Sequence, residues 1–131
     1  MAFQTILRRT TAPAAPPVCI LILASNPEAA VDMGMRVREL GFVAIEPRVD
    51  ERAHAAIARL RPSVVMVQTG REELRCPGLG ISIREISARF IIFGKEWPDV
   101  VDVARRHSAL SLPMQAPAKM IRSAIRHGAP A

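Results

Sequence analysis

The sequence is poor in the residues that mark several classes of protein. It has no tyrosine, one tryptophan and four phenylalanines among 131 residues, so aliphatic side chains must build its core. Its two cysteines, Cys19 and Cys76, are too few for a disulfide framework and lack metal-ligand spacing. No apolar run approaches the roughly 20 residues that a membrane-spanning helix needs. A disulfide-rich miniprotein, a cysteine-based metal domain and a membrane-spanning protein are therefore excluded.

The composition that remains is typical of one globular domain. Half of the residues are hydrophobic and 23% are charged, which excludes a disordered chain. The net charge is +6, from 18 basic and 12 acidic residues, and only Lys95 and Lys119 are lysines. Basic and acidic residues alternate, with no block of five or six like charges. We therefore expect a solvated basic surface, and a dedicated nucleic-acid binder is the less favoured interpretation.

Strand and helix patterns alternate along most of the chain. Residues 1–17, which include Pro13, Pro16 and Pro17, are predicted to form a flexible tail, and 128–131 a second short tail. The domain is expected at 18–127. The predicted strands are 18–24, 42–45, 63–68, 90–93 and 109–112, and the predicted helices are 29–40, 51–60, 79–88, 99–106 and 118–126.

Five strand–helix repeats predict an α/β fold with a parallel sheet covered by helices on both faces. The expected strand order is 2-1-3-4-5, as in flavodoxin-like proteins. Central strands should bury the aliphatic residues Val64, Val65, Met66, Ile91 and Ile92. In the helices, spacing places Val31 and Met35 on one packed side, and Met120, Ile121, Ala124 and Ile125 on another.

Three segments carry a resemblance to a known family. Residues 20–27 (ILILASNP), 61–68 (RPSVVMVQ) and 109–114 (ALSLPM) resemble the strand ends of response-regulator receiver domains, the CheY-like family of two-component signalling. The resemblance covers about residues 18–127. It implies the three-layer fold expected above, a bacterial source and a place in the cytoplasm.

The resemblance also implies where phosphorylation residues should stand. In receivers an acidic pair holds Mg²⁺ and an aspartate accepts the phosphoryl group. The acidic pair maps to Ala24 and Ser25, and the phosphoacceptor maps to Gln68. None of these side chains is a carboxylate, so neither phosphorylation nor a metal is expected.

The residues that read out phosphorylation in receivers are missing as well. The hydroxyl position maps to Gly94, the lysine position to Leu112 and the aromatic switch position to Ala109. A match shifted by four residues would place Ala116 at the lysine position, again without a lysine. The resemblance therefore implies a degenerate receiver without the phosphorylation switch.

Receivers bind partners through their fourth helix, fifth strand and fifth helix. The resemblance implies the same binding surface in this chain. The candidate contact residues are Trp97, Arg105, Arg106, Ala109, Lys119, Arg122 and Arg126. The alternative interpretation is that the basic residues are solvated ends of amphipathic helices. His54, His107 and His127 lie on or directly after three different predicted helices, without acids or cysteines at ligand spacing, so surface histidines and no metal site are expected.

The favoured function is a phosphorylation-independent signalling module that contacts another protein, with a homodimer as one form of that contact. It is expected to be no enzyme, to hold no cofactor and to contact neither membrane nor nucleic acid. Two alternatives stay open. One is a nucleic-acid-associated regulator that uses Arg105, Arg106, Arg122 and Arg126 on phosphates. The other is a small-ligand binder that uses Ser25, Asn26 and Gln68 in the strand-end crevice.

Overall fold

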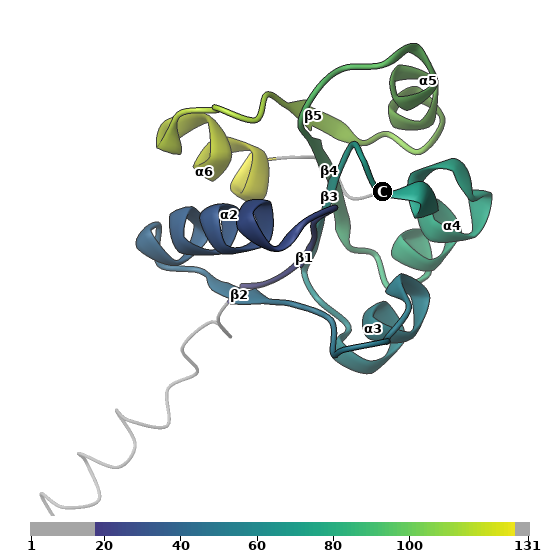
Figure 1. Ribbon diagram of the computed structural model, residues 1–131, viewed down its shortest axis with the longest axis horizontal. Coiled ribbons are helices and arrows are strands. Elements are labelled where there is room, and N and C mark those ends of the chain that lie inside the picture. The colour runs from purple at the N-terminus through teal and green to yellow at the C-terminus, as the bar shows by residue number, and fades with distance from the viewer. Residues whose placement is uncertain (1–17, 128–131) are drawn as a thin grey trace, which may run out of the picture.

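The computed structural model describes residues 18–127, which form a five-stranded parallel sheet between two layers of helices (Figure 1). The strands are β1 (Cys19–Leu23), β2 (Val43–Ile45), β3 (Val64–Gln68), β4 (Arg89–Phe93) and β5 (Leu110–Leu112). Their order is β2-β1-β3-β4-β5, and every pair is parallel. The predicted fold and topology are confirmed. The predicted tails, 1–17 and 128–131, lie outside the described residues.

Helices cover both faces of the sheet (Figure 1). Helices α2 and α6 lie together on one side, and α3, α4 and α5 lie on the opposite side. No helix within residues 18–127 is long and apolar enough to cross a membrane. The bounds are α2 (Pro27–Glu39), α3 (Ala53–Leu60), the 3-10 helix η1 (Glu72–Arg75), α4 (Pro77–Glu85), α5 (Pro98–Arg106) and α6 (Ala118–His127).

The strands divide the apolar side chains between two cores. Val65 packs in the core beneath α3, α4 and α5, whereas Val64 and Met66 pack in the core beneath α2 and α6. This alternation follows from the period of two along a strand. Val64, Val65, Met66, Ile91 and Ile92 are all buried, as predicted.

Helix α2 does not bury the residues that its apolar spacing favoured. Val31 and Met35 are 56% and 54% exposed, so the prediction that they face inward is wrong. The buried positions are Ala29, Ala30, Met33, Gly34 and Val37. Apolar residues occur on both sides of this helix, and the side with small residues packs closer to the sheet. The Arg36 guanidinium also donates to the carbonyls of Met114 and Ala116, which fixes the rotation of α2.

Helix α6 departs from the expectation at one position. Ile121, Ala124 and Ile125 are buried as predicted, but Met120 is 44% exposed. Met120 lies beside β5, an edge strand of only three residues, which is too short to cover it.

Candidate functional site

The carboxyl ends of β1 and β3 are joined by a side chain. The backbone N of Ser25, just after β1, donates a 2.6 Å hydrogen bond to Oε1 of Gln68, the last residue of β3. Parallel strands place their carboxyl ends along the same edge of the sheet, which brings these two residues together. The residue that the resemblance maps to the phosphoacceptor, Gln68, therefore has a neutral side chain whose oxygen is already engaged.

A guanidinium lies beside the same strand ends. Arg71 Nη1 donates to the carbonyl of Ala24 at 3.2 Å, and Nη2 lies 2.7 Å from the Glu73 carboxylate. Glu73 in turn accepts a 3.2 Å hydrogen bond from the backbone N of Ala53, the first residue of α3. Arg71 and Glu73 thus connect the end of β1 to the start of α3.

The end of β4 is closely packed. The backbone N of Thr69 donates to the carbonyl of Phe93, and the backbone N of Gly94 donates to the carbonyl of Leu112, both at 3.0 Å. Gly94 has φ +123°, and a Cβ there would lie 2.7 Å from Oγ1 of Thr69. A serine or threonine at the hydroxyl position would be strained and would collide with Thr69. Leu112 ends β5, which favours the alignment that places Leu112, not Ala116, at the lysine position.

The divalent cation that the resemblance implies does not fit this site. Ala24, Ser25 and Gln68 supply no carboxylate, and the hollow beside them is lined by one acid, Glu46, and by the Arg71 guanidinium that bonds to Ala24. Proteins hold Mg²⁺ through carboxylates and phosphates, whose negative charge compensates the ion for the water molecules that it loses. Across residues 18–127 no three histidine, cysteine or acidic side chains are grouped to bind a metal ion.

The polar residues that could serve a small ligand are engaged within the protein. Oδ1 of Asn26 accepts a 2.8 Å hydrogen bond from the backbone N of Ala29 and caps α2. A hollow of about 270 Å³ is lined by Ser25, Asn26 and Arg71 among others. Gln68 does not line it, so the structure does not bring the three predicted ligand residues into one hollow.

Among the candidate contact residues, Trp97 and Ala109 are half-buried and pack against the core beneath α3, α4 and α5. Trp97 precedes α5, and the Asp99 carboxylate just beyond it binds Arg75 at 2.9 Å. This hydrogen bond lowers the pKa of Asp99. The loop that carries Trp97 is thereby attached to η1.

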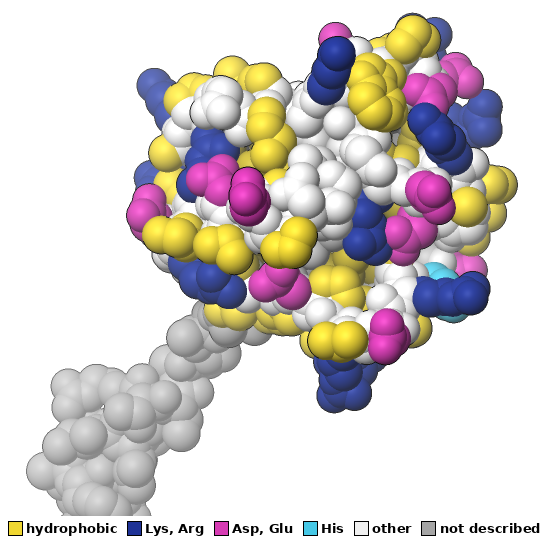
Figure 2. All heavy atoms as spheres, in the orientation of Figure 1, with side chains coloured by type: hydrophobic (Ala, Val, Ile, Leu, Met, Phe, Trp, Pro, Cys, Tyr) yellow, Lys and Arg dark blue, Asp and Glu magenta, His cyan; other side chains and the backbone are white. Residues whose placement is uncertain are grey.

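The basic candidates lie on two layers of the molecule. Arg105 and Arg106 are exposed on α5, where Arg106 pairs with Asp102 at 3.3 Å. Figure 2 shows that acidic and basic side chains are mixed on the face it displays, which matches the alternation of charges in the sequence.

The other basic candidates, Lys119, Arg122 and Arg126, recur at helical spacing and form one stripe on α6. The Arg126 guanidinium stacks 5.8 Å from the centre of the Phe42 ring, just beyond α2. The stripe therefore extends toward α2, whereas Arg105 and Arg106 lie on the opposite helical layer.

Sequence reasoning missed the burial of His107. This residue ends α5 with only 8% of its surface exposed, so the expectation of a surface histidine is wrong for it. A Cβ on Gly80 of α4 would lie 2.4 Å from its Nδ1, which shows how closely the ring approaches α4. Nδ1 has no hydrogen-bond partner within residues 18–127. Burial, followed by the charges of Arg84 and Arg106, lowers the pKa of His107.

Solved structures share this fold. A signal receiver domain of a modulated diguanylate cyclase from Desulfovibrio desulfuricans matches with a TM-score of 0.71 and 14% identity over 86% of this chain and 94% of that one. The fold is that of a receiver domain. The BeF3-activated N-terminal receiver domain of Klebsiella pneumoniae RstA matches with a TM-score of 0.65 and 16% identity over 84% of this chain and 97% of that one.

A third receiver structure covers part of a longer chain. The C-terminal portion of E. coli RcsC, with its linker region and phosphoreceiver domain, has a TM-score of 0.62 and 15% identity over 87% of this chain and 48% of that one. No family profile and no curated protein sequence matches the chain. At these identities the receiver likeness establishes the fold, and the chemistry of the site must be argued from its own residues.

Proposed function

We propose that this receiver-like domain is a cytoplasmic signalling module that works without phosphorylation and contacts another protein. The observation that carries the proposal is the strand-end site, where Gln68 and Arg71 bond to the end of β1. A neutral amide is a poor nucleophile toward phosphorus, and none of Ala24, Ser25 and Gln68 offers Mg²⁺ a carboxylate. The domain therefore has no means of forming an acyl phosphate at this place.

The same residues support a single fixed conformation. A switch needs a group that moves when a ligand arrives and a second state of comparable free energy. Gly94 has no hydroxyl to be drawn inward, Leu112 has no ammonium group, and Ala109 has no ring to follow. The signal is then set by the amount of this protein or by the state of its partner.

The proposed partner surface is formed by α5, β5 and α6. A hollow of about 310 Å³ lies between β5 and α6, lined by Leu110, Met120 and His127 among others. Leu110 is 39% exposed, so apolar side chains are available between the basic residues of α5 and α6. A protein surface with apolar anchors and a surrounding acidic margin fits this chemistry.

A pull-down with purified full-length chain tests the proposal. Reversing three charges of the surface in R105E/R106E/R122E should reduce partner recovery about tenfold, as expected when charges that steer binding are inverted. The matched control is R38E/R48E/R84E, which changes net charge equally at exposed positions elsewhere. Acetyl phosphate and Mg²⁺ should leave recovery by the unmodified chain unchanged. Equal losses in both variants, or recovery that depends on acetyl phosphate, would contradict the proposal.

A further inference from the structure

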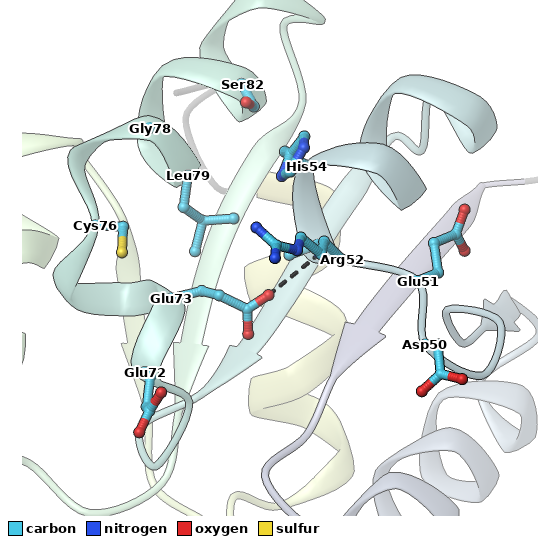
Figure 3. A pocket seen from close by; sticks show the side chains of 11 residues that line it. Asp50, Glu51, Arg52, His54, Glu72, Glu73, Cys76, Gly78, Leu79 and Ser82 are labelled. Carbon is cyan, nitrogen blue, oxygen red and sulfur yellow. Dashed lines mark hydrogen bonds between the residues drawn. The ribbon is translucent and has the colours of Figure 1, made fainter.

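A large hollow lies away from the strand-end site. It measures about 650 Å³ and runs between the start of α3 and the segment formed by η1 and the start of α4. Figure 3 shows Arg52 entering this groove from one wall and Glu73 and Leu79 from the other. Asp50 and Glu72 lie toward one end of the groove, and Ser82 lies toward the other.

Apolar surface predominates in the groove, and one residue of its wall has no side chain. Ala53 and Leu79 belong to the core beneath α3, α4 and α5, and each presents a small remaining surface to the groove. Gly78, at the start of α4, lines the groove without a side chain, and a Cβ there would meet nothing within 4 Å. An apolar side chain could therefore enter the groove beside Leu79.

Acidic residues concentrate around this apolar floor. Asp50, Glu51, Glu72 and Glu73 are four of the twelve acidic residues of a chain whose net charge is +6, and they face one arginine, Arg52. An acidic groove on an otherwise basic protein attracts a cationic segment and disfavours an acidic one.

Two of these acids are already engaged and two are free to bind a cation. Glu51 bonds Arg59 and the backbone N of Arg48, and these hydrogen bonds lower its pKa to about 2. Glu73 pairs with Arg71. Within residues 18–127, Asp50 and Glu72 have no ion pair.

We propose that the groove binds the N-terminal segment of this same chain, residues 1–9. That segment carries the apolar side chains Phe3, Ile6 and Leu7, followed by Arg8 and Arg9. The chain has no acidic residue before Glu28, so the segment is uniformly cationic. Its chemistry complements the groove: apolar side chains cover Leu79, and the two arginines reach Asp50 and Glu72.

The connecting chain is long enough for this contact. The described domain starts at Val18, whose carbonyl accepts a hydrogen bond from Val43 at the amino end of the sheet. The groove lies at the carboxyl end, about 17 Å away along a five-residue strand and about 10 Å to one side. Residues 8–17 include three prolines and span about 31 Å when extended at about 3.1 Å per residue, which exceeds these two displacements added together. The segment can therefore reach the groove of its own domain.

Disulfide trapping tests the contact, because Cys76 lines the groove and is exposed. In the full chain with C19A, the substitution T5C should form an intramolecular disulfide with Cys76 under mild oxidation. The comparison chain carries T5C, C19A, C76S and S123C, which places the acceptor cysteine at an exposed position on α6. Docking should make trapping at Cys76 about tenfold faster, since it raises the local concentration of the thiol.

Blocking variants make the test specific. G78L places a side chain in the groove, and E72K reverses one of the free charges; each should slow trapping about fivefold. E85K is the matched control, because Glu85 is exposed at the other end of α4, and it should leave the rate unchanged. Equal rates at Cys76 and at S123C, or rates insensitive to G78L and E72K, would overturn the proposal. A disulfide between two chains that grows with protein concentration would assign the groove to a second copy instead.

Nuclear magnetic resonance of the full chain gives an independent readout without added cysteines. The substitutions R8E and R9E together should shift the amide signals of His54, Leu79 and Ser82, which line the groove. Shifts absent from these residues would overturn the contact even if the cysteine variants fail to fold. The result is separate from the proposed function, since it depends on neither phosphorylation nor the α5, β5 and α6 surface.

Discussion

Oε1 of Gln68 lies 2.6 Å from the backbone N of Ser25 and accepts a hydrogen bond from it. Gln68 ends β3, and Ser25 follows β1, so one side chain joins two neighbouring strands at their carboxyl ends. The resemblance to receivers maps the residue that would accept a phosphoryl group to Gln68. In this structure the oxygen accepts the hydrogen bond that links the ends of β1 and β3.

Removal of this amide should destabilise the domain. Q68A leaves the backbone N of Ser25 without its partner, and we expect the free energy of unfolding to fall by about 1 kcal/mol. Urea denaturation measures the change. The matched control is Q115A, an exposed glutamine in the loop before α6, which should change stability by less than about 0.5 kcal/mol. Equal effects from the two substitutions would show that the hydrogen bond has no net stabilising role.

The ion pair between Arg71 and Glu73 should couple these two residues energetically. R71Q and E73Q each remove one member, and Glu73 also loses part of its bond to the backbone N of Ala53. Both side chains are partly exposed, so we expect a coupling energy of only about 0.5–1 kcal/mol in a double-mutant cycle. Strictly additive effects would mean that the pair does not hold the start of α3 to the strand-end site.

Restoring the acids should reveal Arg71 as a competitor for the cation. The variant A24D/S25D/Q68D places three carboxylates near the Arg71 guanidinium, which lies at the carbonyl of Ala24. Without metal, crowding them should cost on the order of 1–3 kcal/mol. We expect weak Mg²⁺ binding by calorimetry and clearly tighter binding when R71A is added. Tight binding with Arg71 intact would contradict this.

The burial of His107 predicts a loss of stability in mild acid. Its pKa is lowered in the folded protein, so below the unfolded value of about 6.5 the unfolded state binds more protons. Stability is therefore complete above about pH 6.5 and falls as the pH drops toward the folded-state pKa. Arg84 on α4 and Arg106 on α5 oppose protonation further.

The measurement is the urea midpoint at pH 7.5 and at pH 5.5 for the unmodified chain and for H107F. A phenylalanine ring occupies a similar place beside Gly80 and cannot titrate. The unmodified chain should lose more stability across this range than H107F does. An equal pH response in both chains would exclude His107 as the cause.

The sequence was sufficient for the fold because the inner strands β1, β3 and β4 have continuous apolar runs. Residues 64–67 and 90–93 are buried on both faces, and such runs predict the inner strands of a parallel sheet. Because strands and helices alternate and crossovers between parallel strands are right-handed, few sheet topologies remain possible. The rotation of α2 could not be predicted in the same way. Val31 and Met35 are as apolar as Met33 and Val37, and the contact of Arg36 with the loop before α6 joins residues far apart in sequence.

The sequence predicted which functional groups the candidate site lacks. It did not predict the contacts that take their place. Ala24, Ser25 and Gln68 were identified because receiver strand ends have recognisable spacing. Arg71 gave no signal, since it stands in a polar loop where arginines are common on this basic chain. Its role depends on the distance from Nη1 to the carbonyl of Ala24, a contact across 47 residues.

We propose that this receiver fold carries no phosphorylation chemistry. The most direct test incubates the full chain with Mg²⁺ and radiolabelled acetyl phosphate and follows both bound label and backbone amide signals. We predict no bound label and unchanged signals for Ser25, Gln68 and Gly94, because no carboxylate stands where the phosphoryl group would bind. A bound acyl phosphate in the loop after β3, for which Glu72 and Glu73 are the acceptors to examine, together with shifted strand-end signals, would contradict the account.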